Sequence, residues 1–121
     1  MGADRNGPLV IPKDLLLVYS QPNSDDREDD YNTWYNDVHL GDPIHITGVV
    51  SASRFRLGKN QWSENDEGDR PPYLAIYELE ADDLGNVLDA IRKARERFQF
   101  TNAIAHNSQI AVFEQITGPL S

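Results

Sequence analysis

Residues 73–80, Tyr-Leu-Ala-Ile-Tyr-Glu-Leu-Glu, predict a β-strand with apolar side chains on both of its faces. Side chains alternate between the two faces of a strand. One face carries the odd-numbered residues Tyr73, Ala75, Tyr77 and Leu79. The other face carries Leu74 and Ile76, where a strand with one solvated face would show polar residues. We therefore expect this strand to be covered on both sides.

Three further strands are predicted by short apolar runs between turn-forming residues, at residues 13–20, 49–57 and 109–117. Gly48 precedes the second of these runs, where the chain must turn sharply, and we expect it to have a positive φ angle. The polar segment 58–72 is expected to form a hairpin loop with little to bury.

Two amphipathic helices are predicted by apolar residues at helical spacing that follow capping residues. The first helix is expected to run from Ser24 or Asp25 to about Leu40. Its apolar stripe comprises Tyr31, Trp34, Tyr35 and Val38. The second helix is expected to start after Asp82 or Asp83. Its stripe comprises Leu84, Val87, Leu88, Ile91 and Ala94.

The resulting order, β-α-β-β-α-β, predicts an α+β, ferredoxin-like fold, in which an antiparallel four-stranded sheet carries both helices on one face. We expect a single domain over residues 13–121 after an N-terminal tail, residues 1–12. The face without helices keeps apolar side chains and needs a cover. A second copy of the same sheet is the simplest cover. We therefore expect a homodimer, a dimeric α+β barrel that encloses a hydrophobic pocket.

The composition narrows the classes of partner and location. The chain has 121 residues, no cysteine, and a net charge of −9 from 20 acidic and 11 basic residues. Such a surface repels phosphate backbones and anionic membranes, so we expect no nucleic-acid and no membrane partner. No apolar run approaches the ~20 residues of a membrane-spanning helix, and no signal peptide is evident, so we expect a cytoplasmic protein.

The sequence shows no cofactor or metal motif. It contains no Gly-rich phosphate loop, no dinucleotide fingerprint and no G-x-S-x-G elbow. The three histidines, His39, His45 and His106, lack metal-ligand spacing. We therefore predict no cofactor and no metal, and any chemistry must use His, Tyr, Asp and Arg side chains.

His39 is the catalytic candidate. It follows Tyr35 by four residues and Tyr31 by eight, so these side chains stack along one flank of the predicted helix. A neutral imidazole beside phenols can remove or return a proton near neutral pH. Alternatively, His39 hydrogen-bonds a backbone carbonyl and fixes the helix end. His45 can either pair with Asp42 or be a solvated turn histidine.

Six residues are candidates for substrate binding: Tyr31, Trp34, Tyr35, Arg54, Tyr77 and Phe113. The three aromatic residues of the first helix form either a pocket wall or the core stripe of that helix. Tyr77 and Phe113 lie mid-strand and can point into the barrel. Arg54 either faces the barrel interior, where it needs an anionic partner, or is a surface charge. The partner would be a ligand oxygen or an acid such as Glu78 or Glu114.

Residues 34–55, WYNDVHLGDPIHITGVVSASRF, resemble the signature of the EthD-like group within the dimeric α+β barrel superfamily. The matching residues are Trp34, Tyr35, Val38, His39, Leu40, Pro43, Gly48, Val49, Arg54 and Phe55. The resemblance extends roughly over residues 13–117. It implies a barrel dimer, and a range of activities that includes cofactor-free monooxygenases, polyketide cyclases, isomerases, decarboxylases and dehydratases.

These observations lead to two hypotheses of different classes. The first is a small cofactor-independent enzyme that binds an apolar or aromatic, polyketide-like carbonyl compound. His39 would act as acid–base, and Tyr31, Tyr35 or Tyr77 would orient an oxygen, as in a cyclase, isomerase or dehydratase. The second is a non-catalytic ligand-binding or stress-associated protein. A His–Tyr cluster facing a cavity favours the first hypothesis, and a cavity filled by its own side chains favours the second.

Overall fold

The computed structural model describes residues 12–63 and 70–119, and it contains the predicted strands and helices. The strands are β1 Lys13–Ser20, β2 Val49–Arg56, β3 Tyr73–Glu80 and β4 Gln109–Phe113. The α-helices are α1 Glu28–Trp34 and α2 Leu84–Ala94. Most of the predicted tail, residues 1–11, and the centre of the predicted hairpin loop, residues 64–69, lie outside the described residues.

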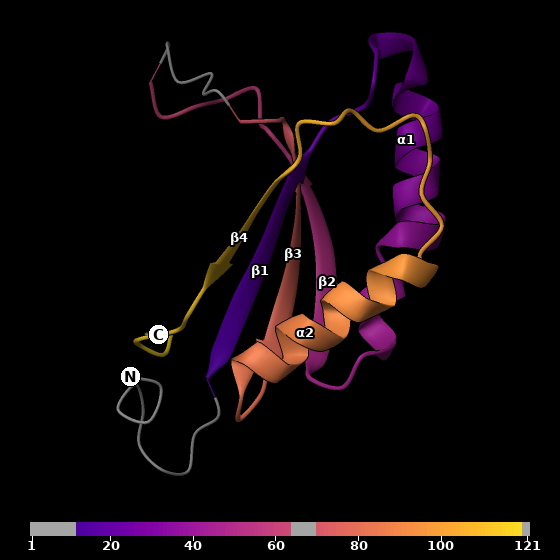
Figure 1. The fold of residues 1–121 in the computed structure, drawn as a ribbon. Coiled ribbons are helices and arrows are strands. Elements are labelled where there is room, and N and C mark those ends of the chain that lie inside the picture. The colour runs from indigo at the N-terminus through magenta and orange to yellow at the C-terminus, as the bar shows by residue number, and fades with distance from the viewer. Residues whose placement is uncertain (1–11, 64–69, 120–121) are drawn as a thin grey trace.

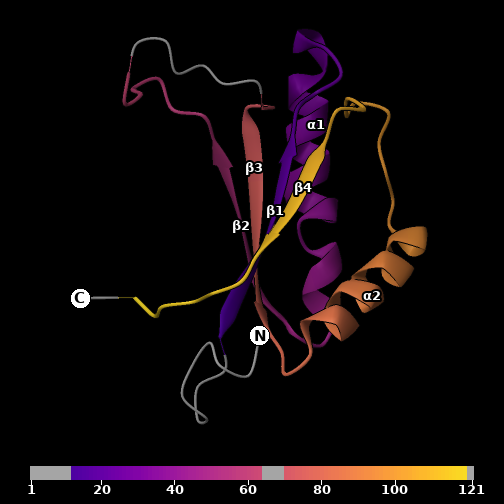
Figure 2. The same cartoon turned by 60° about the vertical axis from the view of Figure 1, so that its left-hand side comes forward.

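The strands form one antiparallel sheet in the order β2-β3-β1-β4. Figures 1 and 2 show both helices on the same face of this sheet, with α2 crossing it diagonally. The arrangement is an α+β fold compatible with the ferredoxin-like type, which confirms the predicted fold class. None of the described helices has the length and apolar character needed to cross a membrane.

The core lies between the helices and the inner face of the sheet. The odd-numbered residues of β3 are buried there, as their alternation predicts. The largest fully buried aromatic side chains are Tyr31, Tyr35 and Tyr77. α2 adds Val87 and Ile91 to this core, and its first turn is capped by Asp83, whose side chain accepts a hydrogen bond from the Asn86 amide at 3.2 Å.

The first predicted helix is divided into three segments. A 3₁₀ turn at Asp25–Arg27 precedes α1, and a π-helical turn at Tyr35–His39 follows it. In the π-helical turn, the Leu40 amide donates to the Tyr35 carbonyl at 2.8 Å. A second 3₁₀ turn spans Asp42–His45. π-Helical turns such as Tyr35–His39 occur often at functional sites. The extra residue in the turn shifts the directions of the side chains that follow it.

The outer face of the sheet is about half apolar, as predicted. The strand register places eight apolar or aromatic residues there: Leu15, Leu17, Tyr19, Phe55, Leu74, Ile76, Ala111 and Phe113. The side chains of Phe55 and Phe113 are 53% and 57% exposed in the single chain. Both helices lie on the opposite face (Figure 2).

Gly48 has the expected positive φ angle, +101°, and is the one described residue with such a value. Its carbonyl accepts a hydrogen bond from the Glu80 amide at 2.8 Å, which joins the start of β2 to the end of β3. A Cβ atom at this position would lie 2.6 Å from Cγ2 of Val87. Backbone conformation and packing against α2 therefore both require glycine here.

We predict that Gly48→Ala and Gly48→Val lower the free energy of unfolding by about 1–3 kcal/mol, because the new side chain meets Val87 and the backbone must hold a strained φ angle. Gly41→Ala is the matched control, since its Cβ would lie at an ordinary 3.9 Å from the Val38 carbonyl oxygen. Chemical denaturation measures the free energy of unfolding of the Gly48 variants and of the control. Equal stability of the Gly48→Ala and Gly41→Ala variants would contradict the prediction.

Candidate functional site

A cavity of about 210 Å³ lies between the helices and the inner face of the sheet. Strands β1 and β3 contribute Leu16 and Tyr77 to its lining, the π-helical turn contributes Tyr35 and His39, and α2 contributes Leu88 among others. The cavity lies within the single chain, on the helix side of the sheet. This position differs from the predicted one, which was between two sheets.

The cavity opens to solvent beside β4. Ile110 and Val112 point to the inner face, because they pair with Val18 and Leu16 of β1. They line the cavity, yet their side chains are 55% and 38% exposed. Phe100, which also lines the cavity, is 50% exposed. The helices therefore leave the inner face of β4 uncovered, and this uncovered strip forms the mouth of the cavity.

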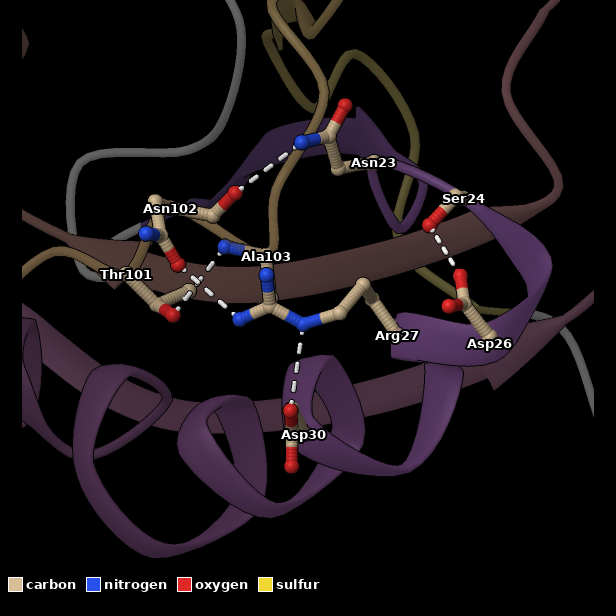
Figure 3. A network of polar contacts seen from close by, with 8 residues as sticks. All are labelled: Asn23, Ser24, Asp26, Arg27, Asp30, Thr101, Asn102 and Ala103. Carbon is tan, nitrogen blue, oxygen red and sulfur yellow. Dashed lines mark hydrogen bonds and ion pairs between the residues drawn. The ribbon is translucent and has the colours of Figure 1, made fainter.

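The segment 98–108, which connects α2 to β4, forms part of the cavity wall and is tied to the residues before α1. Figure 3 shows the network: Arg27 donates to the Asn102 side chain at 2.9 Å, and the Asn23 side chain donates to the Asn102 carbonyl at 3.2 Å. The Asn23 amide donates to the Ala103 carbonyl at 2.5 Å. These bonds, with a β-bridge between Pro22 and Ile104, tie the segment to the residues that follow β1 and place it at the cavity wall.

His39 lies among aromatic rings at the cavity wall, and its side chain is only 14% exposed. Its ring stacks on Trp34, with ring centroids 4.5 Å apart and an interplanar angle of 12°. Tyr35 and Phe98 meet it edge-on, at 5.0 Å and 5.9 Å. Phe100 lies 5.2 Å away. These contacts fix the plane of the imidazole.

Asp42 is the polar neighbour of His39. The Nδ1 atom of His39 lies 3.4 Å from Oδ2 of Asp42, a distance longer than that of a well-formed hydrogen bond. Both atoms are buried, and neither has a closer polar partner among the described residues. Burial lowers the pKa of His39 below its ordinary value, the Asp42 carboxylate opposes this shift, and the positive charge of Arg95 adds to it. Burial in the cavity wall therefore favours the neutral form of the imidazole.

Tyr35 and Tyr77 line the cavity as protonated phenols. Burial, followed by the neighbouring Tyr31, raises the pKa of Tyr35 to about 12. Burial and the Tyr35 phenol raise the pKa of Tyr77 far above its ordinary value. Both hydroxyl groups therefore keep their protons at neutral pH and can donate a hydrogen bond to a ligand oxygen.

Tyr31 and Trp34 support the site from behind its wall. Tyr31 is fully buried beneath Tyr35, and its hydroxyl hydrogen-bonds to that of Ser20 at 2.5 Å. Burial raises its pKa, against the lowering effect of Ser20. The Trp34 indole nitrogen donates to the Gln99 carbonyl at 2.6 Å. Neither side chain is among those that line the cavity. Of the predicted wall residues on the first helix, only Tyr35 does so.

Arg54 takes neither of the two predicted positions. Its side chain points from β2 to the inner face of the sheet, where it donates to Asn36 at 2.7 Å and to Asn32 at 3.0 Å. Its guanidinium carbon lies 4.3 Å from the ring centroid of Tyr35. The predicted anionic partner is therefore replaced by amide oxygens and a π-face. Arg54 holds the aromatic cluster from the side of β2 and does not line the cavity.

The remaining candidates are separate from the cavity. Phe113 lies on the outer face of the sheet and so does not point toward His39. His45 and His106 are exposed, as expected of solvated loop histidines. The structure places Asp42 beside His39, and this pairing was missed because the spacing to His45 was considered instead. Asp42 follows His39 by three positions, and this helical spacing was the available signal in the sequence.

Within residues 12–63 and 70–119, no group of three or more His, Asp or Glu side chains is arranged to hold a metal ion. Comparison of the chain with protein-family models, curated proteins and solved structures gives no match. The resemblance to the EthD-like group therefore stays a prediction that rests on residues 34–55.

We predict that His39 makes the stability of the protein depend on pH. Its pKa is lower in the folded chain than the ordinary value of about 6.5, so the unfolded chain binds its proton more readily. The contribution of the neutral His39 to the free energy of unfolding is fully present when the pH is above the ordinary pKa. Part of this contribution is lost as the pH falls toward the lowered pKa of the folded chain. Unfolding free energies measured from about pH 7.5 to 5.5 should therefore decline for the wild type.

The variant His39→Phe keeps an aromatic ring on Trp34 and should show a smaller decline over this pH range. The control His106→Gln, at an exposed position, should keep the wild-type decline. An identical pH profile for His39→Phe and wild type would contradict the assignment of a lowered pKa to His39.

Proposed function

We propose that the protein is a cofactor-independent enzyme that moves a proton next to the carbonyl group of a small apolar or aromatic compound bound in the cavity. The observation that carries this proposal is the position of His39. A neutral imidazole lines an apolar cavity, and its Nδ1 atom lies beside the partly buried carboxylate of Asp42. This pairing leaves Nε2 as the ring nitrogen that acts on a ligand.

The proposed reaction begins with transfer of a proton from the carbon next to the carbonyl group to Nε2 of His39. The C–H electron pair forms an enolate, and the imidazole becomes an imidazolium. The Asp42 carboxylate stabilises this cation, in line with its upward effect on the pKa of His39. Return of the proton to a different carbon completes an isomerisation. In a cyclisation, the enolate carbon attacks a second carbonyl group of the same ligand, and the imidazolium protonates the resulting alkoxide. In a dehydration, the enolate expels a β-hydroxyl group, which takes the proton and leaves as water.

The phenols of Tyr35 and Tyr77 fit the second requirement of this chemistry, a hydrogen-bond donor for the developing enolate oxygen. Both line the cavity and stay protonated, because burial raises their pKa values. A donor held in place in a site with little water stabilises negative charge more strongly than the same donor in bulk water. Tyr31, a third candidate in the sequence, is instead bonded to Ser20.

We further propose that the working form is a homodimer in which two outer sheet faces meet as a dimeric α+β barrel. The outer face carries eight apolar or aromatic residues, and the rims of this face carry charged ones such as Lys13 and Glu78. A face of this kind is typical of an interface between identical chains. The cavity lies on the other side of the sheet, so dimerisation would support the sheet without closing the mouth.

A non-catalytic ligand-binding protein is the second candidate. The same cavity supports it, because an apolar pocket with two phenols can hold a carbonyl compound without reacting with it. The buried His39–Asp42 pair favours the enzyme, since a binding protein has no need of a histidine beside a carboxylate.

We predict that the wild type accelerates exchange of the methyl protons of small aryl methyl ketones with deuterium in D₂O, as followed by NMR. His39→Phe, which preserves the stacking on Trp34, should slow this exchange by about 10²–10⁴-fold. The affinity for the same ketones should change by less than about threefold. His45→Phe, an exposed control, should exchange at the wild-type rate.

Exchange by His39→Phe at the wild-type rate would contradict the role of His39. Binding of the ketones without any exchange by the wild type would favour the ligand-binding protein. The His39→Phe variant is preferred to His39→Ala, because the stacked imidazole is largely buried and its removal would also cost stability.

We predict that the wild type sediments as a dimer at micromolar concentration and that Ile76→Lys, in the centre of the outer face, sediments as a folded monomer. The expected interface is about 2,000 Å² or more in total. Ala90→Lys places the same charge on an exposed position of α2 and should leave the dimer intact. A monomeric wild type, or a dimeric Ile76→Lys variant, would contradict the proposed interface.

A further inference from the structure

The side of α2 that faces the cavity changes from apolar to cationic as it approaches the mouth. Leu88, Ile91, Arg92 and Arg95 all line the cavity. Their spacing of three, one and three residues places them along one side of α2 and its 3₁₀ extension, Arg95–Arg97. Two guanidinium groups therefore stand where the apolar wall ends.

This cationic end contrasts with the rest of the chain. Residues 92–97, RKARER, contain four of the 11 basic residues in a chain of net charge −9. Basic residues at a helix C-terminus interact favourably with the helix dipole, which accounts for their presence there. The helix dipole does not explain why two of these basic side chains face the cavity. Arg92 and Arg95 line the cavity, whereas Lys93 and Arg97 do not.

Arg95 has no anionic partner in the part of the chain that the structure describes. Arg92 pairs with Asp89 at 2.5 Å, and both of these side chains are largely exposed, so this ion pair is weak. The guanidinium carbon of Arg95 lies 5.7 Å from the ring centroid of Phe100, another lining residue. Its positive charge also contributes to the lowered pKa of His39, so its field extends to the cavity wall.

The size of the cavity limits the ligand. An apolar cavity of about 150 Å³ in another protein is large enough for benzene. The present cavity, about 210 Å³, is below the range of roughly 300–1,000 Å³ that holds drug-sized ligands. A single ring with one or two small substituents matches this volume, and larger substituents must extend through the mouth beside β4.

We propose that the ligand is an anionic, single-ring aromatic carbonyl compound whose carboxylate binds Arg95, with Arg92 nearby, while its ring enters the cavity. A carboxylate and a guanidinium form paired, charge-assisted hydrogen bonds. The ring packs between Leu88 and Phe100, and its carbonyl end points toward His39. This inference names the ligand class for the proposed functional site and rests on that site, but not on catalysis by His39.

The test compares two probes of nearly equal shape, 4-acetylbenzoate and 4-acetylbenzamide, of which only the first is an anion at pH 7. Their dissociation constants are measured by calorimetry with the wild type, Arg95→Gln and Arg97→Gln. Arg97→Gln is the matched control, because it removes the same charge from the same turn at a residue that does not line the cavity.

The expected result is that the wild type binds 4-acetylbenzoate about tenfold or more tightly than 4-acetylbenzamide. Arg95→Gln should abolish this preference and leave the affinity for the amide unchanged, and Arg97→Gln should keep it. Raising the salt concentration should reduce the preference. Any of three results would overturn the proposal. The wild type could bind both probes with equal affinity, Arg97→Gln alone could lose the preference, or neither probe could bind at millimolar concentration.

The variant His39→Phe separates this inference from the proposed catalysis. It should keep the preference for 4-acetylbenzoate, because its cationic mouth is intact, even where it no longer exchanges the methyl protons. A wild type that prefers the acid without exchanging protons supports the ligand class and contradicts the enzyme. A wild type that exchanges protons of the amide and the acid equally well supports the enzyme and overturns the ligand class.

Discussion

The functional features of this protein depend on how two helices cover a four-stranded sheet. α1 with its π-helical turn and α2 bury the inner sides of β2, β3 and β1, but they leave the inner side of β4 exposed at Ile110 and Val112. The connecting segment 98–108 is hydrogen-bonded to Asn23 and Arg27, just before α1 (Figure 3), and it lines this space without filling it. A cavity is the result of this incomplete cover.

Burial acts on the polar groups of the cavity in one direction, toward their neutral forms. It lowers the pKa of His39 and raises the pKa values of Tyr35 and Tyr77, so one base and two proton donors face the same apolar space without charge. The charged groups stand at the edges, with Asp42 behind the imidazole and Arg95 at the mouth. This separation allows an anionic ligand to be held at one end and a proton to move at the other.

The sequence predicts the elements well where one period dominates. The predicted strands 13–20 and 73–80 coincide with β1 and β3, and Gly48 has the expected φ angle. The sequence predicts the direction of side chains less well where the backbone departs from a regular period. A bulge between Val49 and Ser51 moves Val49 to the inner face, which strict alternation does not anticipate.

The candidate site was predicted in part, since His39, Tyr35 and Tyr77 do meet at one cavity. Tyr31, Trp34 and Arg54 support that cluster without lining the cavity, and Phe113 lies on the other face of the sheet. These differences have separate causes. Phe113 was predicted to face a pocket between two sheets, whereas the cavity lies on the helix side of the sheet. The π-helical turn changes which side chains of the first helix face inward, and the sequence carries no evident signal for an i→i−5 hydrogen bond.

The central claim is that a neutral His39 presents Nε2 to a ligand in this cavity while Nδ1 faces Asp42. Nitrogen-15 NMR of the histidine side chains, with and without 4-acetylbenzoate, tests it most directly. We predict an Nδ1-protonated His39 that stays neutral to a lower pH than an ordinary histidine, and an Nε2 resonance that shifts when the probe binds. An Nε2-protonated His39, or resonances that the bound probe leaves unchanged, would contradict it.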